Sequence, residues 1–369
     1  MRFEDVLVIK NGRNQKTVEN PQGKYPIYGS GGIMGYADDY ICEADSVVVG
    51  RKGSINNPLF VEEPFWNVDT AFGLVANREK LLPRYLFYFC RHFDFERLNK
   101  AVTIPSLTKS DLLQIEIDLP DLDEQQDIAD RLYLVEKVIR LRRQELAELD
   151  NLIKARFVEL FGDPIDNPKG LPVKTLKELS TLITNGNTPK GGSENYVDKG
   201  ILFLRSQNVW RNRIEFEDVA YIDEATHRSL KKSSLKHKDI LITKTGRINT
   251  ENSSLGRAAL FLGDDDSANI NGHVYLVRLD GSIVPEYVVT ILTSEAYRKY
   301  IRKVCVGGID KRQINLDQVE DFPIILPTFE SQNEFAAFVE QVDKSKVVVQ
   351  KALDEAQTLF DSLMQEYFG

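Results

Sequence analysis

Two stretches of the chain, LPDLDEQQDIA at 119–129 and LPTFESQNEFA at 326–336, carry the same Leu, Pro, Gln and Ala at equivalent positions. They belong to a longer match. When the sequence is shifted by 207 positions, residues 106–162 align without a gap with residues 313–369. This period is far longer than that of a solenoid repeat. The chain is therefore a tandem duplication of one module, in which a variable segment precedes a shared C-terminal segment.

The shared segment has the pattern of a long amphipathic helix. Apolar residues recur at three- and four-residue steps in both copies, which is the spacing of a coiled-coil seam. No Pro or Gly interrupts Asp123–Phe161, and Gly162 provides a C-cap. The residues expected in the core of the helix pair are Ile128, Leu132, Val135, Ile139, Leu146, Leu149, Ile153, Val339, Val342, Val349, Leu353 and Phe360.

Two equivalent stripes of this length bury each other most simply in an antiparallel pair with pseudo-two-fold symmetry. The alternative is that each helix lies alone on its own globular segment. The segments before the helices alternate short apolar strands with turns and one or two helices, so we expect an α+β fold. The expected domains are globular regions at 1–120 and 171–327, long helices at 121–163 and 328–369, and a linker at 164–170.

Composition limits the classes of function. Three scattered cysteines and four histidines without ligand spacing argue against a disulfide framework and a zinc site. The sequence has neither a signal peptide nor a membrane-spanning run, so we expect a cytoplasmic protein. The net charge is −9, yet residues 227–257 carry a local excess of +6, which is compatible with nucleic-acid binding.

The glycine-rich stretch YPIYGSGGIMGYADDY at 25–40 raises the question of a nucleotide-binding loop. Such loops need glycines between a buried strand and a helix N-terminus. Here turn residues flank both sides, so we expect glycines that serve turns in a β-rich domain.

Motifs of catalysis are missing from the sequence. It contains no phosphate loop, no N-P-P-[YF] or D-P-P-[YF] tetrapeptide of amino-methyltransferases, no E-x-K of metal-dependent nucleases and no G-x-S-x-G elbow. We therefore expect a recognition or scaffold protein rather than an enzyme, without a metal or a catalytic residue.

Both halves offer the donors that DNA recognition needs, namely basic, amide and hydroxyl side chains at strand ends and in Gly-flanked turns. The candidates for DNA contact are Arg51, Lys52, Thr108 and Lys109 in the first half, and Lys190, Arg205, Ser206, Asn208, Lys244, Thr245, Arg247, Lys311, Arg312 and Gln313 in the second. Gln207 lies among the second set.

Several runs together resemble one known family. They are GKYPIYGSGGIMGYADDYICEADSVVVGRKGS at 23–54, PFWNVDTAFGLV at 64–75, NGNTPKGGSENYVDKGILFLRSQNV at 185–209, LITKTG at 241–246 and the two helix ends. As a set, these runs are similar to the specificity subunit of type I restriction-modification systems.

The resemblance implies a non-catalytic subunit with two target recognition domains, each of which binds one half of a split double-stranded DNA target. It also implies that the paired helices hold the domains apart, that two methyltransferase subunits dock on the chain, and that restriction subunits join them. S-adenosylmethionine, ATP and Mg would bind those partners, and no cofactor is expected in this chain. The alternative function is a tandem coiled-coil scaffold that gathers protein partners without binding DNA.

Overall fold

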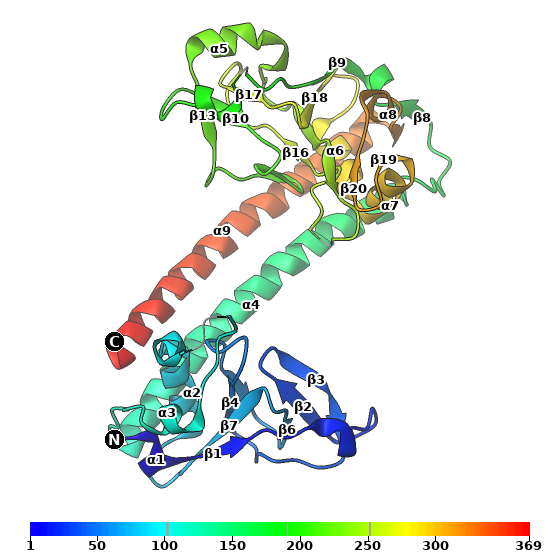
Figure 1. The fold of residues 1–369 in the computed structure, drawn as a ribbon. Helices are drawn as coiled ribbons and strands as arrows, with labels where there is room; N and C mark the ends of the chain where they lie inside the picture. Colours follow the sequence, from blue (N-terminus) through cyan, green and yellow to red (C-terminus); the bar gives the residue numbers. More distant parts are fainter. Residues whose placement is uncertain (101–102, 190, 251) are drawn as a thin grey trace. The chain divides into compact units, whose positions relative to one another are not determined.

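The computed structural model describes residues 1–100, 103–189, 191–250 and 252–369. The chain divides into two compact units, Met1–Glu145 with Val349–Gly369 and Leu146–Val348. Two helices of 40 residues each, α4 (Leu122–Phe161) and α9 (Phe329–Phe368), contribute to both units (Figure 1).

The first unit contains short strands and helices before α4. They are α1 (Phe3–Val6), β1 (Leu7–Asn11), β2 (Tyr25–Gly29), β3 (Gly32–Ala37), β4 (Ser46–Gly50), β5 (Leu59–Val61), β6 (Trp66–Asn67), β7 (Ala71–Ala76), α2 (Pro83–His92) and α3 (Lys109–Leu113), with 3₁₀ turns at Gln15–Thr17 and Phe95–Leu98.

The main sheet of the first unit has the antiparallel order β1-β7-β4-β5. Because side chains alternate along a strand, Val47 and Val49 of β4 face the core formed with α2 and the long helices, whereas Val48 faces a smaller core on the other side. A second sheet has the order β3-β2-β6, in which β2 and β6 are parallel.

The glycine-rich stretch forms the hairpin of β2 and β3, with Ser30 and Gly31 at the turn. Gly32 has a φ of 122°, a conformation that favours glycine. From this hairpin the chain continues into strand β4, not into a helix, so the expectation of turn glycines, and not of a nucleotide-binding loop, agrees with the fold.

The second unit contains more strands. They are β8 (Val173–Thr175), β9 (Ser180–Asn185), β10 (Ile201–Leu204), β11 (Val209–Trp210), β12 (Arg213–Ile214), β13 (Ala220–Ile222), α5 (Glu224–Ser229), β14 (Ile240–Thr243), β15 (Thr245–Arg247), β16 (Ala258–Leu260), β17 (Ala268–Ile270), β18 (Val274–Leu279), α6 (Pro285–Thr293), α7 (Glu295–Val304), β19 (Val306–Gly307), β20 (Lys311–Gln313), α8 (Leu316–Glu320) and β21 (Pro323–Ile325), with 3₁₀ turns at Lys177–Leu179, Gly192–Asn195 and Lys231–Ser233.

The topology of the second unit repeats that of the first. Its main sheet has the order β9-β18-β14-β16, which corresponds strand for strand to β1-β7-β4-β5. The sheet β13-β10-β17 corresponds to β3-β2-β6, and its central strand again has one parallel neighbour. The duplication in the sequence is therefore a duplication of the fold.

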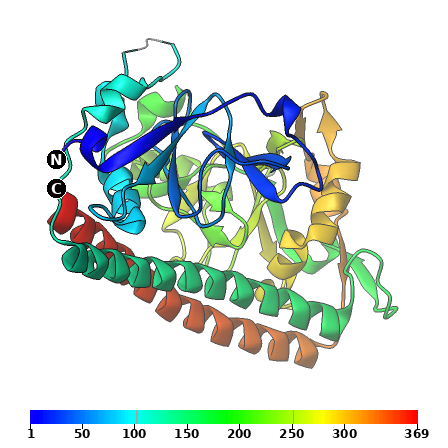
Figure 2. The ribbon, with the colours of Figure 1, turned by 90° about the horizontal axis from the view of Figure 1, so that it is seen from below.

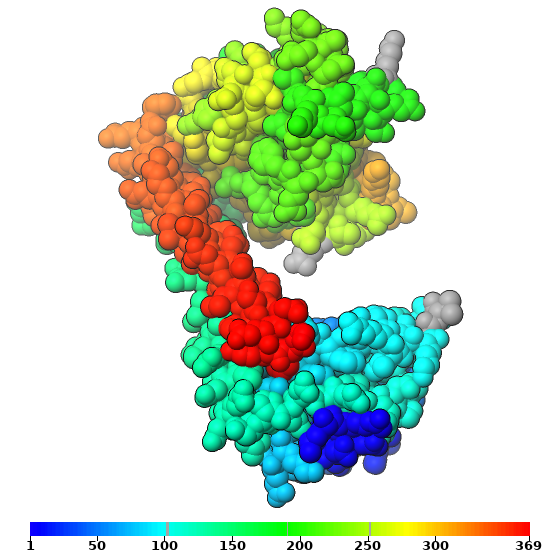
Figure 3. Space-filling view, turned by 90° about the vertical axis from the view of Figure 1, so that its left-hand side faces the viewer, coloured from blue at the N-terminus to red at the C-terminus, as the bar shows by residue number. Residues whose placement is uncertain are grey.

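In the first unit, the N-terminal half of α4 packs against the C-terminal half of α9 (Figure 2). Ile128, Leu132 and Ile139 are buried in one core with Phe360 and Met364. The last turn of α9 also contacts α2, where the rings of Tyr85 and Phe368 lie 5.2 Å apart. In Figure 3 the C-terminal end of α9, in red, lies against residues of the first unit.

In the second unit, the C-terminal half of α4 packs against the N-terminal half of α9. The rings of Phe157 and Phe335 lie 5.5 Å apart, and Lys346 Nζ lies 2.6 Å from an Asp150 carboxylate oxygen. In the first unit the N-terminal half of α4 lies beside the C-terminal half of α9, and in the second unit the reverse holds. The two helices are therefore antiparallel. The expected α+β fold with a long antiparallel helix pair is confirmed.

Most expected seam residues lie in these cores. Ile128, Leu132, Ile139, Ile153, Val339, Val342, Val349 and Phe360 are buried, and Val135, Leu146, Leu149 and Leu353 are half-buried. The heptad pattern missed Phe157 and Met364, which are 3% and 7% exposed. Phe157 was missed because it packs against Tyr287 of α6 as well as against the other long helix.

Among the described residues, no helix is long and apolar enough to cross a membrane.

Candidate nucleic-acid interface

Three of the predicted basic residues of the second unit, Arg247, Lys311 and Arg312, meet on a small three-stranded sheet. After β14 the chain continues into β15, which pairs with β20, so that Thr245 lies opposite Gln313 and Arg247 opposite Lys311. β19 pairs with the other edge of β20. Segments that are more than 60 positions apart in the sequence therefore present their polar side chains together.

Glycine is required in the middle of β15, an edge strand of this sheet. A Cβ atom on Gly246 would lie 2.3 Å from the backbone nitrogen of Leu255. The close approach brings the loop that follows β15 onto the strand, and no other residue would fit without moving that loop.

The cations of this sheet are partly free to contact a ligand. Arg247 is exposed and has an ion pair of 3.3 Å with Asp310, and Lys311 is exposed. Arg312 Nε donates to the backbone oxygen of Gly308, and Gln313 donates to Asn315. Lys244 is half-buried, with its ammonium 5.8 Å from the ring centroid of Tyr275.

The first unit brings its own predicted residues together in the same way. The chain after β4 carries the exposed Arg51 and Lys52, and Lys52 forms a backbone bridge with Ser106. Ser106 aligns with Gln313 when the sequence is shifted by 207 positions. In the first unit the turn after β4, and in the second unit the turn after β14, therefore meets the segment that precedes the long helix of that repeat.

Thr108 and Lys109 have local roles in that segment. The Thr108 hydroxyl accepts from the backbone N–H of Asp111 and caps α3. Lys109 Nζ donates to the backbone oxygen of Ile9 at 2.8 Å. Both contacts hold the segment on the domain. Any contact of these two side chains with a ligand would have to compete with the contacts seen here.

Arg205, Ser206 and Asn208 lie in the long connection between β10 and β13. Arg205 Nη2 contacts an Asp218 carboxylate oxygen at 2.9 Å. Hydrogen bonds from Gln207 and Arg205, together with the charge of Arg205, lower the pKa of the Asp218 carboxyl. The ionised carboxylate of Asp218 therefore fastens the end of this connection to its start.

The structure contradicts the prediction that Asn208 contacts DNA. It is 2% exposed, its side-chain oxygen accepts from the Arg205 backbone, and its amide donates to the backbone oxygens of Glu215 and Asp218. With these groups used inside the loop, Asn208 supports the connection and does not reach a base. Lys190, another predicted contact, lies outside the described residues.

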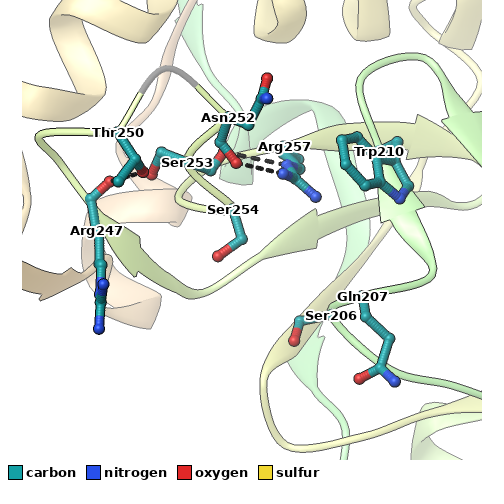
Figure 4. A pocket seen from close by; sticks show the side chains of 9 residues that line it. All are labelled: Ser206, Gln207, Trp210, Arg247, Thr250, Asn252, Ser253, Ser254 and Arg257. Carbon is teal, nitrogen blue, oxygen red and sulfur yellow. Dashed lines mark hydrogen bonds between the residues drawn. The ribbon is translucent and has the colours of Figure 1, made fainter. Parts of the chain in front are cut away.

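A cleft of about 330 Å³ opens beside this connection (Figure 4). Two segments line it, with Ser206, Gln207 and Trp210 on one and Arg247, Thr250, Asn252, Ser253, Ser254 and Arg257 on the other. In Figure 4, Arg257 and Trp210 lie side by side at one end, and Arg247 lies at the other.

The sequence reasoning missed Trp210 and Arg257. The guanidinium carbon of Arg257 lies 3.8 Å from a ring centroid of Trp210, and that of Arg213 lies 5.3 Å from it. The run WRNR at 210–213, in which an aromatic residue stands beside basic ones, was a signal that could have pointed to this place. Burial lowers the pKa of the Arg257 guanidinium, and the neighbouring charge of Arg211 adds to this effect.

The arrangement is suited to binding rather than to catalysis. Guanidinium, amide and hydroxyl groups can donate to phosphates and base edges. Among the described residues, no group of three or more His, Cys, Asp or Glu side chains is placed to hold a metal ion.

Comparisons with known proteins agree on one family. A family model described as "Type I restriction modification DNA specificity domain" matches residues 1–151 and 168–356. The chain is 22% identical over 338 residues to the type I restriction enzyme MjaIX specificity subunit of Methanocaldococcus jannaschii, covering 86% of this chain and 73% of that protein.

Two further similarities differ in extent. A putative type I specificity subunit of Mycoplasma pneumoniae is 27% identical over 171 residues, which is 41% of this chain and 56% of that protein. The crystal structure of the S subunit of a type I restriction-modification system from M. genitalium matches with a TM-score of 0.65 and 16% identity, covering 100% of this chain and 95% of that one. At this identity, the structural likeness concerns the fold.

Proposed function

This chain belongs to the type I restriction-modification specificity family, and from that premise we propose that each globular region reads one half of a bipartite DNA target. As a specificity subunit, the chain recognises and does not catalyse. The proposed recognition domains are residues 1–120 and 171–327, joined through the helices at 121–163 and 328–369 and the linker at 164–170.

One observation carries the proposal: the same polar arrangement occurs twice. In each unit the turn after β4 or its equivalent β14 meets the segment before the long helix. The contact is between Lys52 and Ser106 in the first unit and between Thr245 and Gln313 in the second. Two copies of one reading surface suit a target with two parts. Lys and Arg at these places supply phosphate and guanine contacts, and Gln313 can read adenine.

The helix pair is proposed to set the spacer between the two half-targets. A 40-residue helix spans about 60 Å at 1.5 Å per residue. Half-sites one helical turn apart lie roughly 34 Å from centre to centre, which helices of this length can accommodate.

Two methyltransferase subunits and the restriction subunits are proposed to dock on this chain and to hold S-adenosylmethionine, ATP and Mg. Exposed apolar residues on the long helices support docking. Leu134, Val138 and Leu141 follow a four- and three-residue spacing on α4 and are 59%, 44% and 50% exposed. An apolar stripe that the chain leaves in solvent suits a partner helix.

Sequencing of methylated DNA from a host that expresses this chain with its methyltransferase tests the proposal. We expect one bipartite motif, methylated in both halves and absent without this chain. Exchange of residues 171–327 for those of another family member should change one half of the motif only. Normal methyltransferase binding without any sequence-specific methylation would favour the protein scaffold instead.

A further inference from the structure

The cleft of the second unit occupies the place of a tight contact in the first unit. The connection between β10 and β13 corresponds to the hairpin turn between β2 and β3, because β10 and β2 are the equivalent central strands. In the first unit this connection is only Ser30 and Gly31. In the second unit it runs from residue 205 to residue 219 and carries β11 and β12.

The two connections that meet at this place are equivalent in the two units but differ in length. In the first unit, a Cβ atom on Gly50 at the end of β4 would lie 3.1 Å from Ser30 Cβ. In the second unit the loop after β15 faces the β10–β13 connection. Thr250, Asn252, Ser253, Ser254 and Arg257 lie on one side, and Ser206 and Trp210 lie on the other. Longer connections thus replace a close contact by an open cleft.

The lining of the cleft is rich in donors. Of the nine described residues that line it, none is acidic, and two are arginines. Arg257 is 8% exposed and donates to the backbone oxygens of Ser253 and Asn252. Among the described residues no carboxylate lies within 4.0 Å of its guanidinium, although Glu215 is near enough to raise its pKa. A buried guanidinium without an anionic partner is costly unless a ligand supplies the negative charge.

Charged neighbours of both signs surround Arg257. Arg213 lies over the ring of Trp210 and pairs with Glu215 at 2.7 Å. Burial and then the charge of Arg211 lower the pKa of Arg257, while the charge of Glu215 raises it. The buried Trp210 Nε1 and Arg205 Nε have no hydrogen-bond acceptor in the described part of the chain. Donors without acceptors leave their dipoles uncompensated, which favours an anion nearby.

From this geometry we infer that the cleft binds a phosphate group of the DNA backbone, with Arg257 as the charged contact and Trp210 as the residue that positions it. The inference rests on the proposed function, since the phosphate belongs to the DNA that the second domain reads. It adds a contact that the first unit, with its short Ser30–Gly31 turn, does not have in this form.

The test measures DNA binding by the full chain, in complex with its methyltransferase, on duplexes that contain the mapped motif. Arg257→Gln should weaken binding about tenfold and lower the slope of log K against log salt by about 1, since one phosphate contact is lost. Lys174→Gln is the matched control, because it removes one exposed charge of the same unit on β8, outside the cleft. It should leave the slope unchanged.

The role of Trp210 is tested by a conservative and a disruptive variant. Trp210→Phe keeps an aromatic ring under the guanidinium and should bind DNA within about threefold of the wild type. Trp210→Leu removes the ring and should approach the loss seen for Arg257→Gln. Equal loss in both Trp210 variants would contradict a positioning role. Thermal unfolding of each variant identifies any that fails to fold.

Neutral methylphosphonate linkages, placed one at a time in the half-target of the second unit, locate the phosphate. One linkage should weaken binding of the wild type and have no further effect on Arg257→Gln. The inference fails, while the proposed function stands, if the wild type binds the motif but every linkage weakens binding of the wild type and of Arg257→Gln by the same factor. Absence of any motif-dependent binding would overturn both.

Inorganic phosphate alone forms the last arm. If phosphate raises the melting temperature of the wild type but not of Arg257→Gln, and no linkage is coupled to Arg257, the cleft binds free phosphate. That outcome would overturn the assignment to DNA.

Discussion

Gln125 and Gln332 are identical residues at equivalent positions of the repeat, and both are buried near the start of a long helix. The side-chain oxygen of Gln125 accepts from the backbone N–H of Leu82, the N-cap of α2, and its amide donates to the backbone oxygens of Lys80 and Pro120. Gln332 makes the corresponding contacts with Val284 and Pro327. One amide thus ties the short helix of each domain to its long helix.

We predict that Gln125→Leu lowers the free energy of unfolding by about 3 kcal/mol, because buried backbone groups lose their partners and each costs about 1–3 kcal/mol. Gln126→Leu, at the exposed neighbouring position, should change it by less than about 0.5 kcal/mol. Urea denaturation of both variants measures the difference. Equal effects would show that the buried amide has no special role.

At the scale of the element, α4 carries two apolar faces. One face packs against α9 in both units, through residues such as Leu132 and Ile153. The other face includes the exposed Leu134, Val138 and Leu141. A helix that had only to pair with its equivalent would need one stripe. We therefore attribute the second stripe to the proposed docking of a methyltransferase subunit.

The double variant Leu134→Gln with Leu141→Gln should keep its thermal stability within a few degrees, because both side chains are solvent-exposed in the chain alone. Its affinity for the methyltransferase subunit should fall at least tenfold, since burial of a leucine contributes about 1.5–3 kcal/mol. Titration calorimetry with the purified subunit measures this effect. The double variant Lys137→Gln with Arg140→Gln, at exposed positions of the same turns, is the control. Unchanged affinity of the leucine variant would place the docking surface elsewhere.

The length of the helix pair involves both halves of the chain. Both long helices run without interruption through the boundary between the two units, at Glu145 on α4 and Val349 on α9. Removal of one heptad from each helix preserves the phase of the seam, because the apolar pattern repeats every seven residues.

Deletion of 142–148 together with 349–355, which align in the repeat, should shorten the pair by about 10 Å. The spacer of the recognised motif should then contract by roughly three base pairs at 3.4 Å each. Methylation-site mapping reads the spacer directly. An active deletion variant with an unchanged spacer would reject the ruler. Deletion from α4 alone should abolish activity, because it shifts the two seams out of register.

Much of the fold could be predicted because its signals are local or repeated. The 207-position shift reveals the duplication, and the heptad spacing from Ile128 to Ile153 predicts a buried face, because the period of a helix is a property of consecutive residues. Apolar runs such as SVVVG and DILIT predict the central strands for the same reason. Phe157 was missed because its burial depends on Tyr287, a partner from another element.

The candidate interface could be predicted only in part. The sequence marked Arg247, Lys311 and Gln313 as donors without showing that β15 and β20 would place them side by side. It grouped Asn208 with Arg205, although the fold buries Asn208 and pairs Arg205 with Asp218 where the β10–β13 connection begins.

By itself, the sequence determined two copies of one module, the helix that ends each copy and the family to which the chain belongs. The tertiary structure alone decided that Arg257 lies on Trp210, that a cleft opens where the first unit has Ser30 and Gly31, and which donors remain free. The physical reason is that these features depend on contacts between distant segments. Such contacts follow from the closure of sheets and loops and leave no periodic trace along the chain.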